Sequence, residues 1–229
     1  MDDHSSSLIP LRHSAAHIMA QAVMEILPGT KLGFGPAIDD GFYYDFQLPR
    51  ALSPEDLPAI EARMREIIGG KHPFQHEELS IEAARTKFAD QVFKLDQVQA
   101  LARGEMGEHG ESEAKPQTSV STYTHDGFVD LCRGPHVANT GDVPADALKL
   151  LSIAGAYWRG SEKNPQLTRI YGQRKSVVKR SPREIRPRLT ISTPDSQKQW
   201  LGRTAGREAP ATRNVQTHRC KARESSNWS

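Results

Sequence analysis

The sequence predicts an α+β fold in which helices pack on an antiparallel sheet. Apolar residues recur at helical spacing near the start of the chain, whereas alternating residues and Asp-Gly turn signals farther on indicate hairpins. These helices and hairpins come mixed, without the regular strand–helix alternation of a parallel sheet. The chain is therefore expected to combine α-helices with antiparallel strands.

The first predicted helix covers residues 8–27. Its apolar side chains lie three or four residues apart, at Leu11, Ala15, Ile18, Ala22 and Ile26. Pro28-Gly29 ends this run, because neither residue continues a helix well. A hairpin is then predicted over residues 31–46, with Asp40-Gly41 as its turn signal.

A second helix is predicted to begin at Ser53-Pro54, where a capping side chain precedes proline at the first helical position. It should run to about Ile68 and end at Gly69-Gly70. The later elements follow the same signals. They are a strand at 74–79, helical sequence from Ser80 to 103, a loop at 104–116, a hairpin at 119–131, and strands at 148–160 and 166–172.

The charge balance divides the chain into two parts. Residues 1–172 carry 16 Lys and Arg against 24 Asp and Glu, whereas residues 173–229 carry 14 against 4. The second part also has few large apolar residues and no sustained period, a composition typical of disorder. We expect a folded domain over 1–172 and a basic tail, disordered or unrelated to it, over 173–229.

The cysteine content and the lack of targeting signals favour a cytoplasmic protein. Cys132 and Cys220 lie in these two unlike parts, which is more typical of reduced thiols than of a disulfide. The sequence contains no signal-peptide pattern at its start and no apolar run near 18 residues. We therefore expect no membrane segment.

Two short motifs carry the candidate chemistry. His13 and His17 lie one turn apart on the first predicted helix, and Cys132 and His136 flank the tight turn Arg-Gly-Pro. Together they offer one thiol and three imidazoles, a set that can close a tetrahedral zinc site or leave one position open for water. A metal-free hydrolytic site and a turn without a functional role, beside ordinary surface histidines, are the other possibilities that these residues leave open.

Five segments, in this order, resemble one known family. They are HSAAHIMAQAV, GPAIDDGFYYDF, FVDLCRGPHV, AGAYWRG and TRIYG. The chain is similar over residues 8–172 to the N-terminal editing domain of threonyl-tRNA synthetases. Alanyl-tRNA synthetases and free-standing alanyl-tRNA deacylases share its paired H-x3-H and C-x3-H motifs.

The resemblance implies hydrolysis of serine wrongly esterified to threonine tRNA, which makes tRNA the expected partner. Serine lacks only a methyl group of threonine, which is worth roughly 1–3 kcal/mol of discrimination, so a second, editing site is needed. The alternatives are a free-standing zinc-dependent deacylase and an inactive tRNA-binding fragment. The family's ATP-dependent ligase activity is not expected, because no class II catalytic pattern follows Gly172.

The resemblance also implies roles for individual residues. His13, His17, Lys94, Cys132 and His136 are the expected catalytic group, with Lys94 positioning water or stabilising charge and His13 orienting water or the ribose hydroxyl. The substrate-binding candidates are Tyr44 as pocket wall, Asp130 for the seryl amino group, Arg133 for tRNA phosphates, and Tyr157 and Trp158 for stacking on the terminal adenosine.

Several structural alternatives remain open at the level of sequence. Lys94 is equally compatible with a solvated helix position, Tyr44 and Trp158 with the core, and Arg133 with neutralising Asp130. Zinc at His13, His17, Cys132 and His136 is held in the alanyl-type relatives, whereas the threonyl branch is regarded as hydrolysing without a metal. The expected cofactor is therefore none, with zinc as the alternative.

Overall fold

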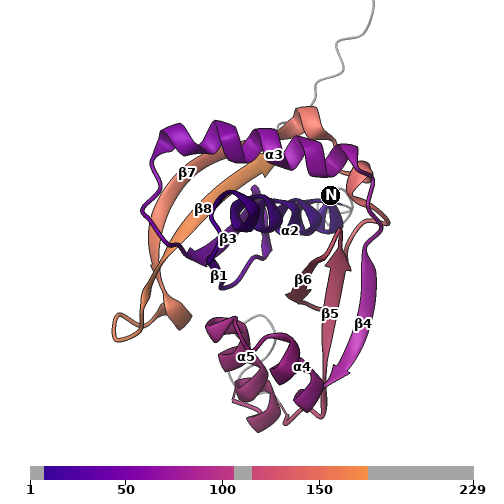
Figure 1. Ribbon diagram of the computed structural model, residues 1–229, viewed down its shortest axis with the longest axis vertical. Helices are drawn as coiled ribbons and strands as arrows, with labels where there is room; N and C mark the ends of the chain where they lie inside the picture. The colour runs from indigo at the N-terminus through magenta and orange to yellow at the C-terminus, as the bar shows by residue number, and fades with distance from the viewer. Residues whose placement is uncertain (1–7, 106–114, 175–229) are drawn as a thin grey trace, which may run out of the picture. The chain divides into compact units, whose positions relative to one another are not determined.

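The computed structural model describes residues 8–105 and 115–174, and within them an α+β fold with two antiparallel sheets (Figure 1). The described helices are α2 (Ile9–Ile26), α3 (Leu57–Gly69), α4 (Ile81–Lys87) and α5 (Val92–Arg103). All described residues lie within one compact unit that ends at residue 178.

The larger sheet has five strands and the smaller one three. The larger sheet contains β1 (Lys31–Leu32), β2 (Ala37–Ile38), β3 (Gly41–Gln47), β7 (Leu148–Tyr157) and β8 (Gln166–Arg174), in the order β1-β3-β8-β7 with β2 paired to β3. The smaller sheet contains β4 (Gln75–Ser80), β5 (Ser119–His125) and β6 (Phe128–Leu131), in chain order. Strand β8 therefore joins the two halves of the larger sheet, since it pairs with β3 on one side and β7 on the other.

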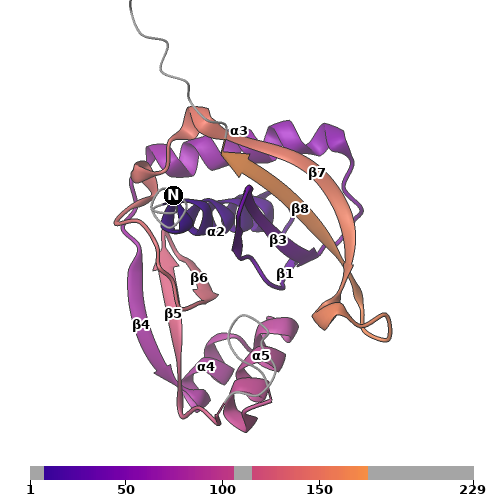
Figure 2. The ribbon, with the colours of Figure 1, turned by 180° about the vertical axis from the view of Figure 1, so that it is seen from behind.

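Helix α2 is the central element of the fold. Every residue from His13 to Val23 is buried, because α2 packs on α3 and also on β3 and β8 of the larger sheet (Figures 1 and 2). A helix segment buried on all sides has no solvent-exposed face, so its polar side chains are enclosed together with its apolar ones. The two histidines of α2 are thereby carried into the interior.

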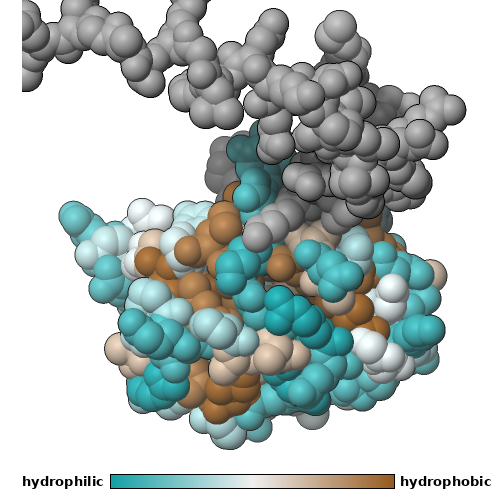
Figure 3. All heavy atoms as spheres, turned by 90° about the horizontal axis from the view of Figure 1, so that it is seen from above, coloured by the Kyte–Doolittle hydropathy of each residue, from teal (hydrophilic) through white to brown (hydrophobic). Residues whose placement is uncertain are grey.

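Three groups of apolar side chains form the core of the described residues. The largest joins α2 and α3 to the larger sheet, and the second lies between α4, α5 and the smaller sheet. The third consists of Phe93, Trp158 and Leu167 with Phe34 packed against it. Seen from above, hydrophilic and hydrophobic residues share the described surface (Figure 3).

The predicted fold class and the order of the elements are confirmed. Ser80 caps α4 as expected, with its Oγ accepting a hydrogen bond from the N–H of Ala83 at 3.2 Å. The hairpin turns at Asp40-Gly41 and Asp126-Gly127 also occur, between β2 and β3 and between β5 and β6. Strand β8 continues to Arg174, past the expected boundary at Gly172.

Other expectations fall largely outside the described residues. The predicted loop at 104–116 is described only at its two ends, and the basic tail only at its first two residues. Cys220 lies in the part of the chain that is not described. No helix in residues 8–105 and 115–174 is long and apolar enough to cross a membrane.

Candidate active site

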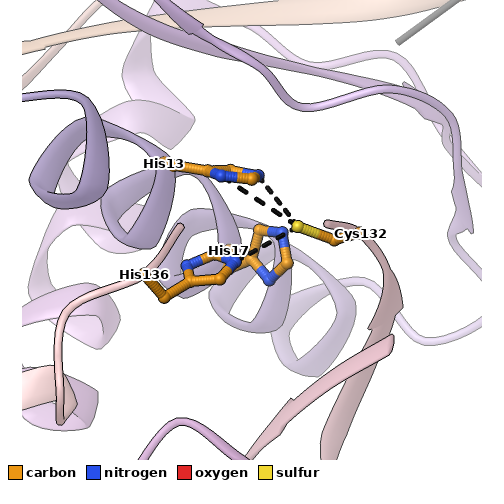
Figure 4. Close-up of side chains that lie close together, drawn as sticks. All are labelled: His13, His17, Cys132 and His136. Carbon is orange, nitrogen blue, oxygen red and sulfur yellow. Dashed lines mark hydrogen bonds between the residues drawn. The ribbon is translucent and has the colours of Figure 1, made fainter. Parts of the chain in front are cut away.

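His13 and His17 project from α2 toward the loop that follows β6, where Cys132 and His136 lie (Figure 4). One ligating atom from each of these four side chains lies within 4.8 Å of the others. The Sγ of Cys132 is 3.2 Å from Nε2 of His13 and 3.2 Å from Nε2 of His136. The structure thus brings the two sequence motifs together, and we call these four residues the His/Cys cluster.

The bend between Cys132 and His136 depends on Gly134. This residue has φ +73°, a left-handed conformation that favours glycine, and a Cβ built there would lie 2.7 Å from the hydroxyl of Tyr123. Its N–H donates a hydrogen bond to Sγ of Cys132 at 3.1 Å. The bend therefore turns the chain back so that His136 faces the thiol, as expected from the sequence.

Ser14 fixes His136 from the other side. Its Oγ accepts a hydrogen bond from the N–H of Val137 at 3.1 Å and lies 3.0 Å from Nδ1 of His136. If the hydroxyl donates to Nδ1, the ring proton of His136 lies on Nε2, which faces Cys132. Ser14 is not among the residues predicted from the sequence, although its position between the paired histidines of α2 was the available signal.

A buried ion pair lies beside the His/Cys cluster. The Nζ of Lys94 is 2.6 Å from Oδ1 of Asp130, and both side chains are almost completely buried. Tyr44 donates its hydroxyl to Oδ2 of Asp130 at 2.5 Å, and Nε2 of His17 lies 3.5 Å from the same oxygen. Because a buried charge pair is costly to form, its position at the edge of a polar cluster favours a functional role.

Burial keeps the groups around this ion pair uncharged. Desolvation lowers the pKa of His17 well below its usual value, and the neighbouring His136 and His13 lower it further. Desolvation likewise lowers the pKa of His136, to about 2. The pKa of Tyr44 is raised well above its usual value, first by burial and then by the carboxylate of Asp130. At neutral pH the site therefore holds neutral imidazoles of His17 and His136, whose nitrogen atoms can bind a metal, and a protonated Tyr44.

A cavity of about 390 Å³ opens onto the cluster and the ion pair. His13, His17, Lys94, Asp130 and Cys132 all line it. Among its other lining residues are three arginines, at 133, 159 and 169, together with Tyr43, Tyr157 and Gln97. Two of these arginines are paired with carboxylates, Arg159 with Asp96 and Arg169 with Asp45. A cavity with this lining can hold a small polar group against the imidazoles and the ammonium.

The substrate-binding candidates are placed differently from one another. Tyr157 is 44% exposed and, like the exposed Arg133, lines the cavity. Tyr44 is fully buried and is not among the residues that line the cavity, but its hydroxyl contacts Asp130 and its ring lies 5.5 Å from Nζ of Lys94. The charge partner of Asp130 is Lys94, which is therefore a buried residue and not a solvated one.

Trp158 belongs to the core. It is 6% exposed, its ring stacks on Phe34 with the centroids 4.7 Å apart, and its Nε1–H donates to Asp96 at 2.9 Å. Phe93 also packs against the ring, with the centroids 4.9 Å apart, so Phe34, Phe93 and the low exposure together leave little of the ring accessible to a nucleobase. Of the two alternatives drawn from the sequence, the structure favours the buried tryptophan.

The His/Cys cluster could hold a metal ion. Three imidazoles and one thiol form a donor set that suits tetrahedral zinc. Nδ1 of His17 is buried and makes no hydrogen bond within the described part of the chain, which is what a metal-ligating nitrogen would show in a structure that carries no ions. The residues therefore fit zinc in kind and in proximity.

Comparisons with known proteins show which proteins this chain is similar to. Residues 120–171 match the family described as "Threonyl and Alanyl tRNA synthetase second additional domain". The chain is 53% identical over 167 residues to "Threonine--tRNA ligase" of Dehalococcoides mccartyi, covering 73% of this chain and 26% of the relative. It is 48% identical over 170 residues to the protein of that name from Rubrobacter xylanophilus, covering 74% and 24%. The chain thus spans about a quarter of the length of the curated relatives it matches.

Proposed function

Because this chain carries a second additional domain of the threonyl- and alanyl-tRNA synthetase family and is similar to part of threonine–tRNA ligases, we propose that it is an aminoacyl-tRNA deacylase. Its substrate is seryl-tRNA(Thr), in which serine is wrongly esterified to threonine tRNA. In this reaction water attacks the ester and releases serine from the tRNA. We place the reaction in the cytoplasm, where tRNA is charged.

One observation carries the proposal: the buried Lys94–Asp130 pair and the His/Cys cluster meet at the same polar cavity. When water attacks an ester, negative charge develops on the carbonyl oxygen, and the Lys94 ammonium is proposed to stabilise it. Asp130 holds Lys94 in place and also faces the cavity, where its carboxylate suits a seryl amino group. His13, with His17 beside it, is proposed to orient the water or the ribose hydroxyl.

Selectivity follows from the size of the substrate's side chain. A site shaped for serine rejects the extra methyl group of threonine by steric overlap, whereas a site shaped for threonine cannot strongly exclude serine. The deacylase is therefore expected to release serine much faster than threonine from the same tRNA.

The test is a deacylation assay with seryl-tRNA(Thr) and threonyl-tRNA(Thr). We expect selective serine release by the unmodified protein and a loss of at least about a hundredfold in His13→Ala and Cys132→Ala. The matched control is His76→Ala, because His76 is exposed and does not line the cavity. If the protein bound the tRNA without releasing serine, the result would instead support a tRNA-binding module. If His76→Ala lost as much deacylation activity as His13→Ala and Cys132→Ala, the assignment of the active site would be wrong.

A zinc-dependent deacylase is the second candidate, favoured by the clustering of four ligating atoms and by the unpartnered Nδ1 of His17 among the described residues. His13, His17, Cys132 and His136 would hold the ion. If one of these four left its position open, the ion would supply a water with lowered pKa there. Metal analysis after zinc loading and dialysis distinguishes the two: one zinc per chain that is lost in Cys132→Ala supports this candidate, and no retained zinc rejects it.

A further inference from the structure

Gln97 presents a buried carboxamide to the cavity of the candidate active site. Its side chain is 2% exposed, it lines the cavity, and its Oε1 is buried with no hydrogen-bond partner in the described part of the chain. Leaving a buried polar atom unpaired costs about 1–3 kcal/mol, so such atoms are rare unless a ligand completes them. Neither the proposed catalytic group nor the core accounts for this residue.

The position of Gln97 follows from helix α5. It lies three residues after Lys94, and residues three apart on a helix share a face. Both side chains are buried and both line the cavity, so α5 presents an ammonium and a carboxamide to the same space. A group that reacts next to Lys94 therefore lies within reach of Gln97.

The chemistry of the carboxamide indicates what it would bind. An amide offers both a donor and an acceptor, and its last torsion is broad, so either end can turn toward the cavity. A hydroxyl both donates and accepts and pairs with either end, whereas an ammonium only donates. The ammonium of an aminoacyl ester is also better matched by the carboxylate of Asp130, which lines the same cavity.

We propose that Gln97 binds the side-chain hydroxyl of the aminoacyl group and is a specificity-determining residue of this site. The inference rests on the proposed function, since it assigns a contact to the serine that is released. In this proposal two kinds of contact together select serine. The hydroxyl is bound at Gln97, while steric exclusion of a methyl group rejects threonine.

The test compares seryl-tRNA(Thr) with alanyl-tRNA(Thr), which lacks only the hydroxyl. Gln97→Met keeps the volume of the side chain and removes its hydrogen-bonding atoms. We expect seryl release to slow about tenfold and alanyl release to change less than about twofold, so that the seryl-to-alanyl ratio falls. Gln99→Met is the matched control on the same helix, because Gln99 does not line the cavity.

A stability measurement separates recognition from a structural role. If Gln97 is held for a ligand, replacing its unpaired atom with an apolar group leaves the melting temperature of Gln97→Met unchanged or raises it. A lower melting temperature together with equal slowing of both substrates would show that Gln97 only supports the fold, and would overturn the proposal.

A binding experiment keeps this inference distinct from the proposed deacylation. Non-hydrolysable seryl and alanyl amides of adenosine are titrated into the unmodified protein and Gln97→Met. A preference for the seryl amide that disappears in Gln97→Met supports the assignment even if no hydrolysis occurs. Equal binding of the two amides by the unmodified protein would overturn the assignment, and would leave deacylation to be judged by serine release alone.

Discussion

Lys94 has the most unusual environment of any lysine in the described residues. It is a charged group buried at 2% exposure, and its partner Asp130 also accepts the hydroxyl of Tyr44 and the N–H of Leu131. Each of these donors makes a hydrogen bond to an oxygen of the carboxylate, and together they reduce the free-energy cost of burying its charge. The pair therefore depends on several hydrogen bonds made together.

Lys94→Met is expected to lower the free energy of unfolding by about 3–5 kcal/mol, because Asp130 would remain as a buried charge without its counterion. Urea denaturation measures this loss. In the double variant Lys94→Met/Asp130→Asn part of the stability should return, since the uncompensated charge is gone, while deacylation stays absent.

The matched control for this prediction is Lys87→Met. Lys87 forms an ion pair with Glu77 at 3.0 Å on the exposed side of α4, where a salt bridge contributes about 0–1 kcal/mol. If Lys94→Met destabilises the protein no more than Lys87→Met does, the ion pair with Asp130 does not have the assigned importance.

Among the elements, the turn after β6 decides the geometry of the His/Cys cluster. It begins with Cys132, bends at Gly134 and returns with His136, so one short loop supplies two of the four side chains. Helix α2 supplies the other two from a single face. The cluster thus requires only two elements to be correctly placed.

Gly134→Ala is expected to destabilise the protein by about 1–3 kcal/mol and to abolish deacylation. Alanine at position 134 would have to keep the left-handed backbone conformation, and its Cβ would lie 2.7 Å from the hydroxyl of Tyr123. We therefore expect the loop to shift and His136 to move away from Cys132. Thermal unfolding and serine release are the two measurements.

Gly127→Ala separates the two causes. Gly127 has φ +79° in the turn between β5 and β6, but a Cβ there meets nothing within 4 Å. We therefore expect Gly127→Ala to lower the free energy of unfolding only by the cost of backbone strain, and to leave the rate of deacylation unchanged. An equal loss of activity in both variants would contradict the assigned role of the bend.

At the scale of the whole molecule, the buried histidines link folding to pH. His125 lies between Phe74 and Phe128, is 1% exposed, and makes no side-chain hydrogen bond within the described residues. Burial lowers the pKa of His125 to about 4. Its neutral form is therefore the one that fits the folded chain.

The free energy of unfolding is expected to fall as the pH decreases from about 6.5 to about 4. In this window the unfolded chain binds a proton at His125 and the folded chain does not, so acid favours unfolding, by up to about 3 kcal/mol from this residue. Above about pH 6.5 His125 is neutral in both the folded and the unfolded chain, so it no longer makes the free energy of unfolding depend on pH. Urea denaturation across this range measures the slope.

His125→Phe should reduce this pH dependence without removing it, because His17 and His136 titrate in the same direction. His76→Ala is the control, since His76 is exposed. A slope that is the same in His125→Phe as in the unmodified protein would refute the assignment to His125.

The local elements and the residue types of the candidate site could be predicted from the order of the amino acids alone. Helical spacing placed His13 and His17 together on α2, and Asp-Gly signals placed the hairpin turns, because periodicity and turn chemistry act over a few residues. The Arg-Gly-Pro bend likewise indicated that Cys132 and His136 face each other.

Which of these side chains are buried, and what they contact, became known only from the folded chain. Lys94 was equally compatible with a solvated position until α5 packed it against Asp130 of β6, and Trp158 with nucleobase stacking until Phe34 covered its ring. The unpaired carboxamide of Gln97 has no signature in the sequence at all. Burial and hydrogen-bond partners come from segments far apart in the chain, so they exist only once the sheets and helices have closed around the cavity.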